Sequence, residues 1–308
     1  MIRHAVRASS ALAAALSLAA CTRTSTPGDT SAESGAARTA AGVVDSTRRV
    51  ATVGGFSEPE AVRYDPVQDF YFVSNFNGSG DARDNNGFIS RLRADGTVER
   101  LRFAAGGVGG VTLHAPRGMT ILGDTLWVCD ADAVRGFDRR TGAPVATVDF
   151  SAQDVGFLND ITPGPDGALY VTDTGRDRIY RIAGRAIAVA LADSTLGRPN
   201  GITWDSAGGR LIVVPYGGGR AIFAWRPGTA TLDTVGTSAG AQFDGVEVLP
   251  GGRLLVASQR DSSLHLFEGG RGRAIVRTAG EPADIAVDTR RHRVAVPGRQ
   301  AKIARPPP

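Results

Sequence analysis

Four oxygen-bearing side chains recur at one position of a repeated sequence pattern, which is how distant residues come to build a cation site. Each pattern has a short apolar or Pro-led start, one special position, a strand-like run, a turn and a second strand-like run. The special positions are separated by 57, 42, 41, 44 and 39 residues. They hold Glu60, Arg117, Asn159, Asn200, Asp244 and Ala283.

The two carboxylates and two amides of this set would repel one another, or remain unsatisfied, unless a cation or an arginine neutralised them. The set contains neither sulfur nor imidazole, and oxygen ligands of this kind suit hard cations such as Ca²⁺. A plainer interpretation is that the four side chains bind water in a channel and cap strand ends. Because four of them share one repeat position, we favour the metal.

The repeat itself predicts the elements that position these residues. Turn sequences such as Gly164-Pro165-Asp166-Gly167 separate runs rich in β-branched and aromatic residues, which is typical of tight β-hairpins. A period near forty with several strands per unit is typical of a propeller blade, and Gly and Pro interrupt every helical pattern. The longer first step is explained by an insertion at residues 76–87.

The sequence therefore predicts an all-β fold, a six-bladed β-propeller of four-stranded blades spanning residues 48–303, with a tail at 304–308. The innermost strand of each blade lines the central channel, so the six special positions become a ring. The last blade runs short of sequence after Val296. Since an open propeller would expose strand edges, we expect residues 48–53 to supply its missing outer strand.

Several motifs resemble one protein family. These are Pro59-Glu60, Asn159-Asp160 followed by PDGALYVTDT, Pro199-Asn200-Gly201-Ile202 and Phe243-Asp244-Gly245. From residue 55 to 298 the chain is similar to the senescence-marker-protein/gluconolactonase/luciferin-regenerating-enzyme group, which is related to the paraoxonases.

The resemblance implies that Glu60, Asn200 and Asp244 bind one divalent metal and that Asn159 lines the substrate pocket. It implies Ca²⁺ first, with Mn²⁺ or Zn²⁺ as alternatives. Phe157 stands where sugar lactonases carry an arginine, which argues against a sugar-acid substrate. Ala61 stands where paraoxonases carry an acid that helps to hold a second calcium, which argues against a second metal.

The function implied is hydrolysis of lactones or related small esters, in which the metal polarises the carbonyl group. Asp244 is the candidate base and Asn159 the second catalytic residue, while His114 is the other candidate base or a loop residue without chemistry. Arg117 either reaches the substrate or forms a salt bridge to Glu60 or Asp244. The alternatives are a non-catalytic propeller that acts as a binding platform and a quinone-dependent sugar dehydrogenase.

The N-terminus reads as a targeting segment. Residues 1–20 have a basic start, a short Ala/Leu run and small residues before Cys21, which resembles a bacterial lipobox. Residues 21–47 lack the apolar groups needed for a core and are expected to form a disordered tether. We therefore expect lipidation at Cys21 and a location in the bacterial cell envelope, facing the periplasm or the cell surface.

Composition limits the other partners. The formal charge of +4 over 308 residues predicts no nucleic-acid partner. Membrane contact is expected only through the lipid anchor. Cys129 is the remaining cysteine once Cys21 is lipidated, and its strand-like context predicts an inert buried thiol. The sequence contains no Gly-x-Ser-x-Gly or phosphate-loop motif.

Overall fold

A computed structural model describes residues 49–298 and 301–304 of the chain. Within these ranges nearly all regular structure is β-strand, as predicted, and none of the helices is long and apolar enough to cross a membrane. The helical elements are two three-residue turns, η2 (Ser194–Leu196) and η3 (Pro250–Gly252).

The strands follow one another in groups of four, and successive strands of a group pair antiparallel, which confirms the predicted four-stranded units. The first group is β2 (Pro59–Asp65), β3 (Phe70–Asn75), β4 (Phe88–Arg93) and β5 (Val98–Ala105). The second is β6 (Met119–Leu122), β7 (Thr125–Cys129), β8 (Ala133–Asp138) and β9 (Pro144–Asp149). The third is β10 (Leu158–Pro163), β11 (Leu169–Asp173), β12 (Arg178–Ala183) and β13 (Ala186–Ala192).

The fourth and fifth groups are joined into one eight-stranded sheet, because their outer strands β17 and β21 pair in parallel at two residue pairs. The fourth group is β14 (Pro199–Asp205), β15 (Arg210–Pro215), β16 (Ala221–Trp225) and β17 (Leu232–Ser238). The fifth is β18 (Phe243–Val248), β19 (Leu254–Ser258), β20 (Ser263–Glu268) and β21 (Arg271–Arg277).

The last group combines both ends of the described chain. It contains β22 (Ala286–Asp288), β23 (Arg293–Val296), β24 (Ala301–Ala304) and β1 (Arg49–Val53). Here β1 takes the outer position and pairs antiparallel with β24. The strand predicted at residues 48–53 therefore completes this sheet.

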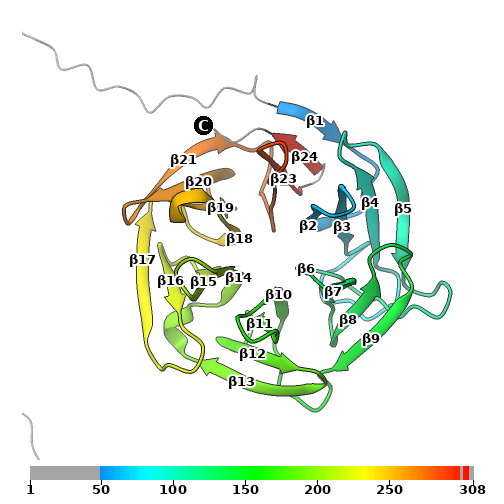
Figure 1. Cartoon of the computed structure of the whole chain (residues 1–308), viewed down its shortest axis with the longest axis horizontal. Helices are drawn as coiled ribbons and strands as arrows, with labels where there is room; N and C mark the ends of the chain where they lie inside the picture. The colour runs from blue at the N-terminus through cyan, green and yellow to red at the C-terminus, as the bar shows by residue number, and fades with distance from the viewer. Residues whose placement is uncertain (1–48, 299–300, 305–308) are drawn as a thin grey trace, which may run out of the picture. The chain divides into compact units, whose positions relative to one another are not determined.

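The first strands of the groups lie nearest the centre of the arrangement, as Figure 1 shows. Each contacts the first strand of the next group, and β22 contacts β2, so that the inner strands close a circle. This circle brings residues that are far apart in sequence to one axis, and it gives the fold its propeller-like form.

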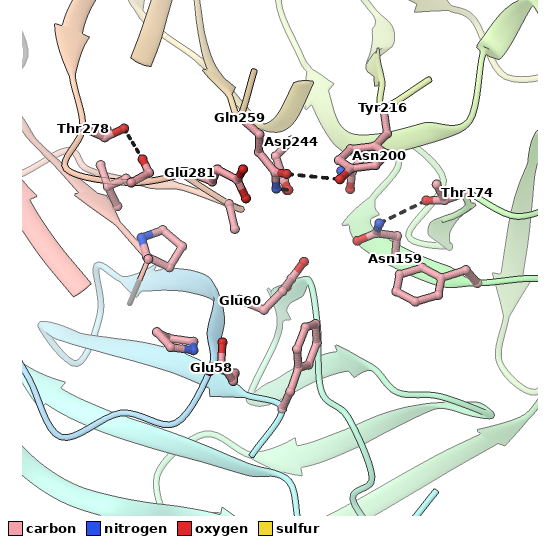
Figure 2. Close-up of a pocket in the computed structure, with 18 of the residues that line it drawn as sticks. Glu58, Glu60, Asn159, Thr174, Asn200, Tyr216, Asp244, Gln259, Thr278 and Glu281 are labelled. Atoms are coloured by element: carbon pink, nitrogen blue, oxygen red, sulfur yellow. Dashed lines mark hydrogen bonds between the residues drawn. The ribbon is translucent and has the colours of Figure 1, made fainter. Parts of the chain in front are cut away.

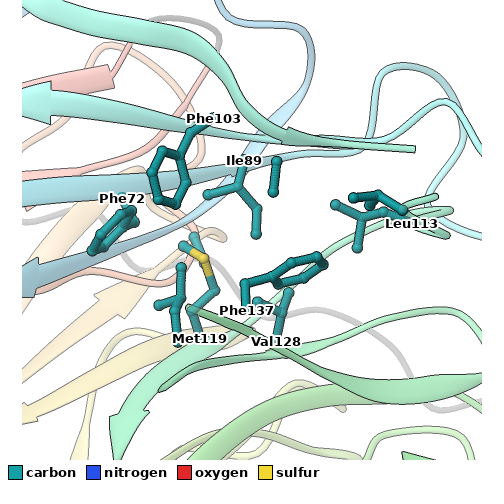
Figure 3. Close-up of a cluster of buried hydrophobic side chains, with 11 residues drawn as sticks. Phe72, Ile89, Phe103, Leu113, Met119, Val128 and Phe137 are labelled. Atoms are coloured by element: carbon teal, nitrogen blue, oxygen red, sulfur yellow. The ribbon is translucent and has the colours of Figure 1, made fainter. Parts of the chain in front are cut away.

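Apolar side chains fill the space between neighbouring groups. The cluster between the first and second groups is shown in Figure 3, where Phe72, Ile89 and Phe103 pack against Met119, Val128 and Phe137. Equivalent clusters separate each further pair of neighbours, including the last group and the first. Full burial of each large apolar side chain contributes about 1.5–3 kcal/mol. The packing therefore holds the inner strands at fixed positions around the axis.

Candidate functional site

Breaks in strand pairing place four of the six repeated positions. The register of the inner strands β2, β10, β14 and β18 shifts at the same point relative to their hairpin partners. Two residues lie within each break, and a bulge of this kind redirects a side chain out of the regular alternation. The first residue within each break is Glu60, Asn159, Asn200 or Asp244.

Glycine follows three of the repeated positions because the next inner strand passes very close. A Cβ atom on Gly201 would overlap the main-chain oxygen of Asp244, and one on Gly245 would overlap the amide nitrogen of Ile285. A side chain on Gly118 would likewise overlap Asp160. These glycines allow the inner strands to approach closely enough for the repeated side chains to meet.

A cavity of about 1250 Å³ opens on the axis, and five of the six repeated positions line it: Glu60, Asn159, Asn200, Asp244 and Ala283. Figure 2 shows the carboxylates of Glu60 and Asp244 and the amides of Asn159 and Asn200 directed toward one another across this space. The convergence that the repeat predicts is therefore present in the structure.

Three of the converging oxygens have no hydrogen-bond partner among the described residues. They are Glu60 Oε2, Asn200 Oδ1 and Asp244 Oδ1. The three residues are only 9%, 3% and 4% exposed. Buried polar atoms are nearly always paired, and an unpaired one costs about 1–3 kcal/mol. This triplet of oxygens therefore fits a cation, and its members are the residues that the sequence predicts as metal ligands.

The remaining polar atoms of the site are held in place by neighbouring side chains. Asp244 Oδ2 accepts a hydrogen bond of 2.6 Å from Gln259 Nε2. The side-chain oxygen of Gln259, Oε1, accepts one of 3.2 Å from the Tyr216 hydroxyl. Asn159 Nδ2 donates to Thr174 Oγ1 at 3.0 Å. Gln259, Tyr216 and Thr174 follow the second strands of their hairpins, so the repeated inner-strand positions do not include them.

Burial and like charges make the carboxyl groups of the site weaker acids than usual. Burial, together with the charge of Asp160, raises the pKa of Asp244 to about 7, although the side-chain amides of Asn200 and Gln259 oppose this. Burial and the nearby Asp244 raise the pKa of Glu60 well above its ordinary value, and Arg117 only partly counteracts them. Both carboxylates thus resist ionisation unless a positive charge joins them.

A second layer of carboxylates lies further along the same inner strands. Arg63, three residues after Glu60, donates from Nη1 to Glu247 at 2.8 Å and from Nε to the Met119 carbonyl at 2.6 Å. Its Nη2 group lies 3.5 Å from Asp284. Asp160 accepts main-chain hydrogen bonds from Ile161 at 2.7 Å and Ile202 at 2.8 Å. We call Arg63, Asp160, Glu247 and Asp284 the arginine layer.

Arg117, the repeated position of the second group, does not line the cavity. Its guanidinium carbon lies 3.7 Å from the centroid of the Phe157 ring, so the two groups stack. Nη1 donates to the Leu158 carbonyl at 3.1 Å and Nη2 to the Gly80 carbonyl, while Nη2 lies 3.9 Å from Asp81. Among the described ion pairs, Arg117 forms no salt bridge to Glu60 or Asp244, although its positive charge still lowers the pKa of Glu60. Its predicted contact with the substrate stays a prediction.

His114 also lies outside the residues that line the cavity. Its Nδ1 accepts the main-chain N–H of Asn85 at 3.0 Å. With Asp130 and Asp132 it presents ligand atoms within 4.8 Å of one another, a second group that could hold a metal. However, Arg135 donates to Asp130 at 2.6 Å and to Asp132 at 2.7 Å, so a protein cation already satisfies much of this charge.

A serine, a histidine and an aspartate are linked in a chain that the sequence analysis did not identify. Ser238 Oγ lies 2.5 Å from His265 Nδ1, and His265 Nε2 lies 2.9 Å from Asp261. Hydrolases use this combination of residues, but a nucleophile must face its substrate. Ser238 is buried at the seam between the fourth and fifth groups, and none of the three residues lines the cavity.

The remaining predictions from the sequence concern Cys129 and the N-terminal segment. Cys129 is free and buried, as predicted, and burial raises its pKa well above the ordinary value. The predicted signal at 1–20, the lipidation site Cys21 and the tether at 21–47 lie outside the described residues.

No model of a known protein family and no curated protein matches the sequence. Solved structures do match. A gluconolactonase from Xanthomonas campestris has a TM-score of 0.64 at 19% identity, over 86% of this chain and 94% of that one. A second protein, proposed to be a gluconolactonase, has a TM-score of 0.63 at 18% identity, over 83% of this chain and 91% of that one.

Lyases share the same architecture. A streptogramin B lyase has a TM-score of 0.60 at 13% identity, over 82% of this chain and 96% of that one. At these identities the likeness establishes the fold. That fold is the one found in gluconolactonases, which supports the family resemblance that the motifs carry.

Proposed function

We propose that this chain, which shares its fold with gluconolactonases, is a divalent-metal-dependent hydrolase of lactones or related small esters. The observation that carries the proposal is the set of unpartnered oxygens on Glu60, Asn200 and Asp244, which face one cavity. The eight-stranded sheet counts as two blades joined at their outer strands, so the fold is a six-bladed propeller with this cavity on its axis.

The chemistry of the donor set favours Ca²⁺ over Mn²⁺ and Zn²⁺. Glu60, Asn200 and Asp244 offer carboxylate and amide oxygens without sulfur or imidazole, which suits hard cations. Two carboxylates also match the charge of one divalent ion. When bound, the ion supplies polarisation of the ester carbonyl.

The side chains around this set supply the other parts of a hydrolytic site. Asp244 is held at Oδ2 by Gln259 and would both offer Oδ1 to the ion and accept the proton of the attacking water. That proton would then pass to the ring oxygen as the ester C–O bond breaks. Asn159, oriented by Thr174, holds the ring of the ester in the cavity. Arg117 and His114 receive no direct substrate contact in this proposal because neither lines the cavity.

The lyase neighbours define a competing chemistry, elimination without water. One of them, a virginiamycin B lyase from Staphylococcus aureus, is catalytically inactive in a form in which one histidine is replaced by alanine. Among the described residues that line the cavity here, none is a histidine. A histidine is therefore missing from the described wall of the site, which favours hydrolysis in our proposal. The same observation disfavours a quinone-dependent dehydrogenase with a histidine base.

Calorimetric titration and a panel of small, uncharged lactones test the proposal together. Wild type should bind one Ca²⁺ and hydrolyse at least one lactone, while Asp244→Asn should lose both properties and Asp233→Asn, an exposed control, should keep both. Incorporation of labelled oxygen from water distinguishes hydrolysis from elimination. Binding of Ca²⁺ without turnover of any lactone or ester would instead support the non-catalytic platform, with a structural ion.

We also infer that the protein is a lipid-anchored component of the bacterial cell envelope, from the small residues before Cys21 and the apolar-poor segment that follows. A Cys21→Ser variant should leave the membrane fraction. Wild-type protein found as soluble material without added acyl mass would contradict the inference.

A further inference from the structure

A buried histidine links two segments of the fifth group. His265, in β20, is 1% exposed. Its Nδ1 lies 2.5 Å from Ser238 Oγ, and its Nε2 lies 2.9 Å from Asp261 Oδ2. A carboxylate only accepts hydrogen bonds, so in the neutral ring Nε2 donates to Asp261 and Nδ1 accepts from the serine hydroxyl. The histidine thus joins the end of β17 to the turn between β19 and β20.

The two segments joined in this way lead to Asp244 and to its hydrogen-bond partner. Residues 239–242 connect the end of β17 to β18, in which Asp244 is the second residue. The turn of residues 259–262 carries Gln259, whose amide donates to Asp244 Oδ2 at 2.6 Å (Figure 2). The segments also bond each other, since the Gln259 N–H donates to the Gln242 carbonyl at 3.1 Å. Their relative position therefore decides how the two side chains meet.

Close packing and further hydrogen bonds make this link rigid. The Gly240 N–H donates to Ser238 Oγ at 3.3 Å, and a Cβ atom on Gly240 would lie only 2.9 Å from His265 Nε2. At the other end, Ser263 Oγ donates to the second carboxylate oxygen of Asp261 at 2.8 Å. A buried polar network whose members are satisfied holds its side chains in one arrangement.

The first three groups hold the corresponding segment in a simpler way. At the end of their second strands, the side chains of Asn75, Asp130 and Asp173 accept main-chain N–H groups from the segment before the inner strand. The fifth group has Ser258 at this place, and its hydroxyl accepts the Ala241 N–H at 3.3 Å. In this group the histidine network connects the same segment to the following turn as well.

The fold does not require a histidine at this position. His265 pairs with Val256 of β19. The corresponding residues of the third and fourth groups are Tyr180 and Phe223, which pair with the equivalent valines of β11 and β15. A phenyl ring therefore fits at this place in the repeat, and the ring nitrogens of His265 are not needed for packing.

We propose that His265 is a positioning residue for the cation site. Through Asp261 it fixes the turn that carries Gln259, and the Gln259 amide fixes the carboxylate of Asp244. The inference rests on the proposed function for the role of Asp244 as a metal ligand. His265 does not line the cavity, so it acts on the ion only through these residues. Ser238 supports the imidazole ring and is not a nucleophile.

Calcium affinity, measured by calorimetric titration, tests the assignment. His265→Phe keeps an aromatic ring but removes both hydrogen bonds, and it should weaken calcium binding about fivefold, the effect of roughly one hydrogen bond. Gln259→Ala should weaken binding about tenfold, because loss of a group that orients a metal ligand typically costs about 10–100-fold. The double variant should bind no more weakly than Gln259→Ala alone, since residues that act through one another are not additive.

Two control variants separate positioning from folding. His265→Gln keeps an N–H donor in place of Nε2 and should retain most of the calcium affinity. Tyr71→Phe removes a buried hydrogen bond of 2.8 Å to Asp288 between the first and last groups, so it should lower thermal stability and leave calcium affinity unchanged. Where calcium binds, an unchanged affinity in His265→Phe, an additive double variant or an equal loss in Tyr71→Phe overturns the assignment.

The side-chain amide of Gln259 gives a readout that needs no metal. In metal-free protein with isotope-labelled glutamine, its NMR signal, identified by its absence in Gln259→Ala, should shift in His265→Phe and stay in place in Tyr71→Phe. If wild type binds no calcium but the signal shifts, the proposed hydrolase fails and the positioning of Gln259 stands. If lactones are hydrolysed with calcium but neither signal nor affinity changes in His265→Phe, the positioning role fails and the hydrolase stands. No calcium binding together with an unchanged signal contradicts both.

Discussion

The same inner strands carry two layers of buried acids, and the layers are neutralised in different ways. In the arginine layer, Arg63 lies against Glu247 and Asp284, and main-chain N–H groups satisfy Asp160. In the layer at the cavity, Glu60 and Asp244 each keep one oxygen without a partner in the described structure. At most three strand residues, about 10 Å along a strand, separate the residues of one layer from those of the other.

The contrast lies in what each arginine contacts. Arg63 extends to groups on other sheets, whereas Arg117, the arginine at a repeated position, donates its hydrogen bonds to the Leu158 and Gly80 carbonyls. One layer therefore contains its own cation, and in our proposal the other takes its cation from solution. Four measurements test this difference.

Removal of Arg63 should have the largest effect. An Arg63→Met variant leaves Glu247 and Asp284 without their cation, and breaking a buried ion pair costs about 3–5 kcal/mol. Urea denaturation should show this loss, and added Ca²⁺ should not restore it. Arg226→Met, which removes an exposed partner of Asp233, should cost less than about 1 kcal/mol. Equal losses in the two variants would contradict a special role for Arg63.

Loss of the calcium effect should come second. An ion bound only by the folded protein stabilises it by about 2.7 kcal/mol at a concentration one hundred times its Kd. Wild type and Asp233→Asn should show this gain in urea denaturation, and Asp244→Asn should lose most of it. A full calcium effect in Asp244→Asn would mean that the ion binds elsewhere, for instance at His114, Asp130 and Asp132.

The pH dependence should show a smaller effect. Asp244 has a pKa of about 7 in the folded protein against an ordinary 3.8, so the folded state holds its proton more tightly. In metal-free protein, its contribution to stability is therefore full below about pH 4 and is lost as the pH rises toward 7. Calcium affinity should move the other way and increase over the same range. Thermal unfolding at several pH values, with calcium or a chelator, should show both trends, and Asp244→Asn should weaken them.

The smallest effect on stability should follow Asn159→Ala. The variant loses the hydrogen bond to Thr174, worth about 0.5–1.5 kcal/mol, and removes no charge from either layer. Calcium affinity should stay within about twofold of wild type by calorimetry, while lactone turnover falls. A large drop in affinity would make Asn159 a ligand and extend the cavity layer to four residues.

The repeat predicted much of this arrangement because period and turn chemistry are local properties of a sequence. The four-stranded units, the strand near residue 50 and the meeting of Glu60, Asn159, Asn200 and Asp244 follow from it. Side-chain direction does not. Arg117 occupies the repeat position, but its guanidinium stacks on the Phe157 ring and donates to the Gly80 carbonyl. Gly80 belongs to the 76–87 insertion, and this insertion has no counterpart in the other units.

The arginine layer was missed for a different reason. Arg63 and Glu247 each stand three residues after a repeated position, where the other groups carry Thr120, Thr162, Thr203 and Ala286. When the repeats are aligned at this second position, Arg63 and Glu247 are the two charged residues, and their charges are opposite. Gln259 and Asp261 lie in a loop, whose path is set by tertiary packing that the repeat does not encode.

The pairing of β1 with β24 has a consequence for the order of events during synthesis. The outer strand of the last sheet is among the first described residues to be made, yet its partner, residues 301–304, is among the last. Contacts between such distant positions form slowly because a long loop must close. The nascent chain therefore carries an unmatched strand edge until residues 301–304 have been made, and the circle of described sheets closes only after that point.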